Sequence, residues 1–181
     1  KSKGDYKGGA LSRETEPKLA IGATYDLNHN SVKDRSNMGS YLFIDEGQGY
    51  YQTTINTLFI DAMFKFQGFS VMAEYANRDA NNPVVTNSDG SETGDVVSVG
   101  NGFNLMTGYL LDNDVEVTGR YTTISLDKAI TGKDIENQYT LGFSKYFRGH
   151  KLKVQSDISY LDVLNNDTSG LMYRLQFELH F

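Results

Sequence analysis

Apolar and polar side chains alternate without a break along the last eleven residues of the chain. The odd positions of this stretch are Leu171, Tyr173, Leu175, Phe177, Leu179 and Phe181. The even positions between them are polar, with Met172 the one exception. Because a β-strand points successive side chains to opposite faces, this pattern predicts a strand with one apolar face and one polar face.

The same alternation recurs along the rest of the chain, where almost nothing has a sustained helical period. About eight strands are predicted, at Lys18–Leu27, Thr57–Phe66, Phe69–Ala76, Val96–Leu111, Val115–Ile124, Gln138–Phe147, Lys151–Leu161 and Leu171–Phe181. Gly100 and Gly102 mark a bulge in the overlong fourth strand, or the point where that strand leaves a membrane. We expect an all-β antiparallel fold, with a polar linker or loop at 1–16 and strands over 17–181.

The connections between the predicted strands alternate between long and short. The long ones are 28–56, 77–95, 125–137 and 162–170, and the short ones are 67–68, 112–114 and 148–150. Outer-membrane β-barrels have short periplasmic turns and longer extracellular loops. A soluble β-sandwich, which composition alone favours, gives no reason for this alternation. The alternation of long and short connections therefore predicts a transmembrane antiparallel β-barrel.

Aromatic residues on the apolar face fall into two bands in this orientation. The band near the outer ends contains Tyr25, Tyr75, Tyr121, Tyr139, Tyr160 and Tyr173. The band near the inner ends contains Phe66, Phe69, Tyr109, Phe147 and Phe181. Two aromatic bands that flank aliphatic residues are typical of a barrel at the two membrane interfaces.

The composition excludes several classes of protein. No apolar run approaches the roughly 18 residues that a membrane helix needs. The chain has no cysteine, which excludes disulfide frameworks and thiolate metal sites. Its net charge of -6 does not favour nucleic-acid binding. The chain begins with Lys1 and without a signal segment, so we expect a processed product or a fragment.

The polar face carries charges of both signs. The candidate pore-lining residues are Asp61, Lys65, Glu74, Arg78, Glu116, Arg120, Lys153, Asp157, Arg174 and Glu178. Unpaired charges are unfavourable in a dry interior, so this face indicates either a water-filled channel or a network of paired charges. Met63, Met72 and Leu110 on the same face suit the second alternative, a packed interior.

Catalytic and metal-binding motifs are absent from the sequence. His29, His150 and His180 have no metal-ligand spacing, and no nucleophile motif occurs. The acidic, glycine-rich stretch 87–95 lacks the EF-hand pattern and is interpreted as a solvated loop. We therefore expect no enzyme activity, no metal and no cofactor.

With the strands placed, the chain resembles the C-terminal half of porins of the phosphate-selective porin O/P family, in the versions found in Bacteroidota. The matching stretches are Gly102–Leu110, Val115–Tyr121, Gln138–Phe147 and Tyr173–Phe181. The resemblance implies a barrel of about 16 strands, a homotrimer or larger outer-membrane complex, and a C-terminal signal at Phe177, Leu179 and Phe181 for the barrel-assembly machinery. Because this segment is acidic, the resemblance supplies no phosphate-binding residue.

The sequence therefore predicts an outer-membrane porin of a Gram-negative bacterium. It would lie among outer-membrane lipid and lipopolysaccharide and let small hydrophilic solutes or ions diffuse, without chemistry and without nucleic acid. One alternative is a complete eight-stranded barrel with a plugged interior, which anchors, adheres or binds through its long loops. A second alternative is a soluble ligand-binding barrel of lipocalin type, with the apolar face turned inward.

Overall fold

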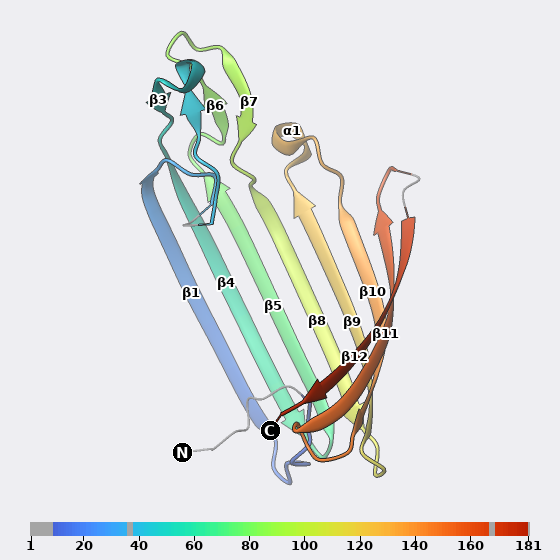
Figure 1. The fold of residues 1–181 in the computed structure, drawn as a ribbon. Coiled ribbons are helices and arrows are strands. Elements are labelled where there is room, and N and C mark those ends of the chain that lie inside the picture. Colours follow the sequence, from blue (N-terminus) through green and yellow to red (C-terminus); the bar gives the residue numbers. More distant parts are fainter. Residues whose placement is uncertain (1–8, 36–37, 167–168, 181) are drawn as a thin grey trace.

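A computed structural model describes residues 9–35, 38–166 and 169–180, and one eight-stranded antiparallel sheet dominates it (Figure 1). Each strand of this sheet pairs with the next one along the chain. The strands are β1 (Lys18–Ser31), β4 (Thr53–Phe66), β5 (Phe69–Ala80), β8 (Gly100–Leu110), β9 (Val115–Leu126), β10 (Glu136–Tyr146), β11 (Leu152–Val163) and β12 (Ser169–Leu179). The predicted all-β antiparallel class is confirmed.

The predicted fourth strand, Val96–Leu111, is wrong at its start. Val96 ends a separate short strand, β7 (Glu92–Val96), and β8 begins only at Gly100. Gly100 has a φ of 136°, and a Cβ there would lie 2.4 Å from the carbonyl oxygen of Ser125. Only a residue without a side chain fits at this position, where the pairing of β8 with β5 and β9 begins. The other seven strands are found at the predicted places, with ends shifted by a few residues.

The three short connections are tight turns at one end of the sheet. Gln67 and Gly68 both have positive φ, 45° and 85°, as a two-residue hairpin turn of type I′ requires. Asp114 and Gly149, in the other two turns, also have positive φ. We call this end of the sheet the inner end, and the end with the long connections the outer end.

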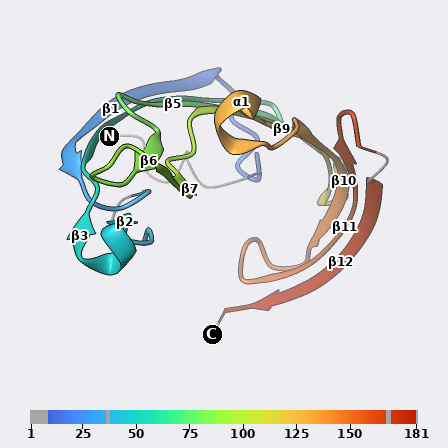
Figure 2. The same ribbon diagram turned by 90° about the horizontal axis from the view of Figure 1, so that it is seen from above.

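The sheet curves into an open trough (Figure 2). In the part of the chain that the structure describes, β1 pairs only with β4 and β12 only with β11, so the two edges do not meet. Neighbouring strands are staggered. The row of paired residues that starts at Lys18, the first residue of β1, ends at Arg174, five residues before the end of β12.

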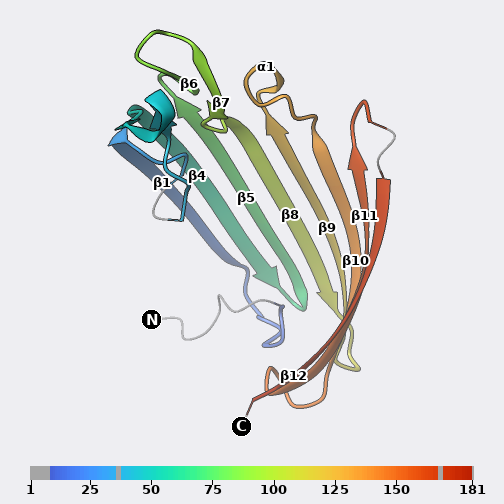
Figure 3. The same ribbon diagram turned by 45° about the horizontal axis from the view of Figure 1, so that its top comes forward.

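Two of the long connections form a small lobe at the outer end (Figure 3). This loop lobe consists of residues 32–52 and 81–99, with residues 36–37 outside the description. Its elements are β2 (Phe43–Ile44), the 3-10 helix η1 (Asp45–Gly47), β3 (Gly49–Tyr50), β6 (Val84–Thr86) and β7. Its buried residues are Leu42, Val85, Val97 and Val99, which pack on Ile55 of β4 and Ala80 of β5.

The third long connection contains a helix that the sequence pattern did not reveal. This helix, α1 (Lys128–Thr131), begins after Asp127, whose carboxylate accepts a hydrogen bond from the backbone N–H of Ala129. It ends at Gly132, which has a φ of 67°. One turn of helix is too short to give a helical period. No helix in the described ranges is long and apolar enough to cross a membrane.

The two faces of the sheet differ in curvature as well as in polarity. The loop lobe and α1 lie inside the curve (Figure 2) and cover the face that carries Ile55 and Ala80. The pairing register places the polar positions of all eight strands on this same face. The polar face is therefore concave and the apolar face convex.

Candidate functional site: the concave polar face

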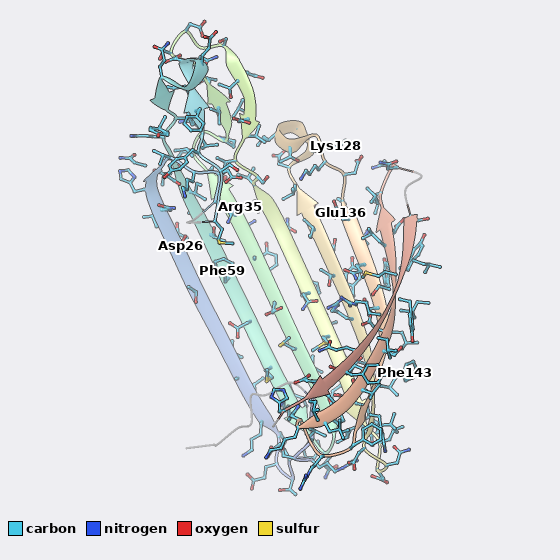
Figure 4. All side chains as sticks on the ribbon, in the orientation of Figure 1. Asp26, Arg35, Phe59, Lys128, Glu136 and Phe143 are labelled. Atoms are coloured by element: carbon cyan, nitrogen blue, oxygen red, sulfur yellow. The ribbon has the colours of Figure 1, made fainter. Side chains whose placement is uncertain are left out.

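All ten residues predicted to line a pore lie on the concave face. The register places Asp61 opposite Glu74, Asp157 opposite Arg174 and Lys153 opposite Glu178. The remaining four are Lys65, Arg78, Glu116 and Arg120, which occupy positions of the same face on β4, β5 and β9. Arg78 lies near the outer end, opposite Thr57 and Gly100, and Figure 4 shows Asp26 in the same outer half of the sheet.

The charges on β11 and β12 are paired across the two strands. Lys153 Nζ lies 2.6 Å from Glu178 Oε2. Arg174 Nη2 lies 3.0 Å from Asp157 Oδ1, and Arg174 Nε lies 3.1 Å from both oxygens of that carboxylate. Glu178 Oε1 is also 2.6 Å from Nε2 of His180. This side of the concave face therefore agrees with the expectation of a paired network.

The charges on β4 and β5 are arranged in the opposite way. Asp61 and Glu74, both acidic, are direct cross-strand neighbours, an arrangement that usually destabilises a sheet. Glu74 Oε2 accepts a hydrogen bond of 3.0 Å from Asn104 Nδ2, and Asn104 Oδ1 accepts one of 2.9 Å from Thr122. Two neighbouring carboxylates are tolerated more readily when water and counterions reach them.

Glycines leave room for polar groups that lie flat along this face. A Cβ at Gly22 would lie 2.4 Å from Asp61 Oδ2, and a Cβ at Gly142 would lie 2.5 Å from Thr118 Oγ1. At Gly108 a Cβ would lie 2.8 Å from Glu116 Oε1. The side chains of Asp61, Thr118 and Glu116 occupy the space that a larger neighbour would fill.

Arg120 lies in the middle of the concave face. Its Nη2 donates to Thr140 Oγ1 at 3.4 Å, and Thr140 in turn contacts Ser159 Oγ at 2.8 Å. Its Nε is the one buried side-chain nitrogen or oxygen in the described ranges without a hydrogen-bond partner. Thr140, which bonds to Arg120, and Asn104 and Thr122, which bond in series to Glu74, were missed among the candidate residues, although the same alternation places all three on the polar face.

Lys65 and Glu116 are only 3% exposed, unlike a charge on an open pore wall. Lys65 Nζ donates to the carbonyl oxygen of Gly9 at 3.1 Å, and the hydroxyl of Tyr146 donates to Glu116. Residues that precede β1 therefore lie over the inner end of the concave face. The polar composition of 1–16 gave no indication of this contact, because the group that accepts from Lys65 is the backbone carbonyl of Gly9.

A cavity of about 580 Å³ lies beside these residues on the concave face. Its lining includes Gly9, Lys151, Lys153, Glu178 and His180. The cavity holds both acidic and basic groups, so it is polar and can contain water.

The convex face exposes its apolar side chains. Leu171 is 75% exposed, Phe177 72% and Ile21 71%. Phe143 also projects from this face, in the inner half of β10 (Figure 4). Phe177 and Leu179 of the expected assembly signal lie on it, whereas Phe181 falls outside the described residues.

The acidic stretch 87–95 is explained by hydrogen bonds within the loop lobe. Asp89 accepts hydrogen bonds from the backbone and side chain of Ser91, which lower the pKa of Asp89. Asp45 of η1 accepts from the backbone and hydroxyl of Ser88, which lowers the pKa of Asp45. Across residues 9–35, 38–166 and 169–180, no group of three or more His, Asp or Glu residues is arranged to hold a metal ion.

Comparisons with protein families, with curated proteins and with solved structures find no match for this chain.

Proposed function

We propose that this chain forms part of the wall of an outer-membrane β-barrel through which small hydrophilic solutes or ions diffuse. The observation that carries the proposal is the difference in polarity between the two faces of one sheet. The convex face exposes large apolar side chains on seven of the eight strands, all but β9, and the concave face carries the ten charged residues predicted from the sequence. A sheet needs an apolar medium against its apolar face, and lipid on the outside of a barrel is such a medium.

The positions of the tyrosines support a membrane on the convex side. Tyr25 is seven residues from Lys18 at the inner end of β1, and Tyr121 is six residues from Val115 at the inner end of β9. Tyr160 is eight residues from Leu152. Although the strands are staggered, these rings stay at nearly the same distance from the inner end, as an interfacial band requires.

The stagger supports a barrel wall in particular. A closed sheet requires its strands to tilt by about 35–45° and its register to shift in one direction around the ring. Here the row of paired residues begins with Lys18 at the inner end of β1. It reaches β12 at Arg174, five residues from the inner end of that strand, so it shifts toward the outer end as it crosses the sheet. A flat sheet of a soluble protein has no need of such a progressive shift.

The unpaired edges of β1 and β12 support a barrel with more than eight strands. Lipid offers no hydrogen-bond partners, so each edge must pair with another strand. We propose a barrel of about 16 strands, as the resemblance to the phosphate-selective porin O/P family implies, with the outer membrane, lipopolysaccharide, the barrel-assembly machinery and a trimer as its setting. Selectivity for phosphate is not part of the proposal, because the concave charges are mixed in sign.

A second candidate is the complete eight-stranded barrel with a plugged interior. The ion pairs Lys153–Glu178 and Asp157–Arg174 favour it, since they resemble a salt-bridged interior. It requires β1 to pair with β12, and these strands are separate in the structure (Figure 2). The lipocalin-type alternative requires an apolar concave face, and the concave face here is polar.

Recording from the full-length protein in planar lipid bilayers tests the proposal. The porin should partition into detergent and give stepwise, weakly selective conductance. Insertion without conductance would favour the plugged barrel. Extraction into buffer without detergent would contradict both membrane candidates.

A further inference from the structure

The segment before β1 runs across the inner end of the concave face. We call residues 9–16 the inner strap. Ala10 in this strap is 0% exposed, and the N–H of Arg13 donates to the carbonyl oxygen of Ala10 at 3.0 Å, which closes a turn. The strap is therefore packed against the sheet.

One end of the inner strap is held by buried charged residues of the concave face. The carbonyl oxygen of Gly9 accepts a hydrogen bond of 3.1 Å from Lys65 Nζ. A Cβ at Gly9 would lie 2.9 Å from Glu116 Oε2 and 3.0 Å from the hydroxyl oxygen of Tyr146. Only a glycine backbone approaches these groups so closely, and it covers two charges that would otherwise face the lumen.

The other end of the inner strap is tied to two inner turns. Arg13 Nη1 donates to the carbonyl oxygen of Leu110 at 3.1 Å, and Nη2 donates to that of Leu111. Arg13 Nη1 also lies 3.4 Å from Asp112 Oδ1. The carbonyl oxygen of Glu14 accepts from the N–H of Gln67 at 2.9 Å. The strap thus contacts the β4–β5 turn, the β8–β9 turn and the floor of the trough.

We infer that the inner strap forms the constriction of the pore at its inner mouth and sets the size limit for solutes. This inference rests on the proposed function, since it assigns the narrowest part of the same pore. The strap lies inside the curve, where a barrel has its lumen, and Gly9 forms one side of the cavity of about 580 Å³. Small polar solutes and hydrated ions pass through this cavity, between the strap and the groups of Lys151, Lys153, Glu178 and His180.

Two variants of the full-length protein in planar bilayers test this inference. Arg13→Ala removes three of the strap's contacts and should raise the single-channel conductance and admit larger polyethylene glycols. Lys128→Ala, which breaks an ion pair with Asp134 at the outer end, is the matched control and should leave both unchanged. Equal conductance in Arg13→Ala and wild type would contradict the inference.

A cysteine variant keeps the test decisive if Arg13→Ala fails to assemble. The chain has no cysteine, and Ser12 is an exposed residue of the strap. In Ser12→Cys, a bulky methanethiosulfonate reagent added from the inner side should lower the current. The same reagent should leave the current of Lys133→Cys, at the outer end, unchanged. Unchanged current in labelled Ser12→Cys overturns the inference whatever Arg13→Ala does. A silent wild-type protein overturns the proposed function instead.

Discussion

The loop lobe and the eight-stranded sheet place their apolar side chains in opposite ways. In the lobe, Val85 and Val97 are 0% exposed and form a small core with Leu42 and Val99, as in a soluble protein. In the sheet, Ile21, Leu171 and Phe177 are mostly exposed. One chain thus contains a region that buries its apolar residues within itself and a larger region that does not.

In the proposed barrel the two regions face two different solvents, water around the lobe and lipid against the convex face. The lobe buries its large aliphatic side chains in a local core, so it is stable in water. The convex face leaves a large apolar surface, which soluble monomers rarely expose. Substitutions in the sheet should therefore affect assembly in the membrane, whereas substitutions in the lobe should affect local stability.

The largest effect is expected on the convex face. Leu175 lies on this face near the middle of β12, opposite Ser156. Leu175→Arg should cost roughly 2–4 kcal/mol of barrel stability, because a lipid-facing cation lies near the centre of the membrane. Assembly is measured by heat-modifiable migration in gels.

The matched variant on the concave face is Thr118→Arg. Thr118 lines the polar cavity, so the added cation can reach water. This variant should assemble normally and shift ion selectivity toward anions, as reversal potentials would reveal. If Leu175→Arg and Thr118→Arg assemble equally well, the two faces are wrongly assigned.

A smaller effect is expected in the core of the loop lobe. Val97→Ala removes buried apolar groups and should destabilise the lobe by about 2 kcal/mol. The sheet should remain assembled, because the lobe has its own core. Limited proteolysis at Lys33 or Arg35 should speed up while heat-modifiable migration stays unchanged. Loss of assembly would show instead that the lobe and the sheet fold as one unit.

The smallest effect is expected at the contact between η1 and the 81–99 loop. The hydrogen bonds from Ser88 lower the pKa of Asp45. A group whose pKa is lowered on folding stabilises the fold above its ordinary pKa, and this contribution is lost as the pH falls through the lowered value. Below a pH of about 4, the Ser88 amide should lose protection from hydrogen exchange.

Asp45→Asn should weaken the same contact at neutral pH, because it removes the negative charge that accepts these hydrogen bonds. Glu92→Gln, an exposed position on β7, is the control and should leave the protection of Ser88 unchanged. A Ser88 amide that is equally protected in Asp45→Asn and wild type would show that this contact does not hold the lobe together.

The sheet was predictable from the sequence because its signal is local and periodic. Alternation from Leu171 to Leu179 fixes which side chains share a face, and short turns such as Gln67-Gly68 fix the antiparallel order. The ten charged residues on one face follow from the same period. The opposition of Asp61 and Glu74, by contrast, depends on register, and register becomes visible only when the strands are paired.

The loop lobe and the inner strap were not predictable in this way. Val85 and Val97 belong to segments too short to show a period, and they are buried in a cluster whose members come from segments far apart in the sequence. The strap is held by the carbonyl of Gly9 and by Arg13 bonds to carbonyls of Leu110 and Leu111. Each of these bonds is accepted by a backbone carbonyl, and carbonyls are the same in every residue, so the sequence does not reveal which carbonyl Lys65 or Arg13 contacts.

The glycines at 22, 108 and 142 have a consequence for the width of the proposed pore. The side chains of Asp61, Glu116 and Thr118 lie over these glycines, in space that a larger residue would occupy. They therefore lie along the sheet and do not project toward the axis of the proposed pore. The electric field of the carboxylates still acts on a passing ion, because Coulomb attraction does not require contact. Charge and width can thus change separately in the proposed pore: enlarging Gly22 or Gly108 would push the carboxylate of Asp61 or Glu116 toward the axis and narrow the pore without altering its net charge.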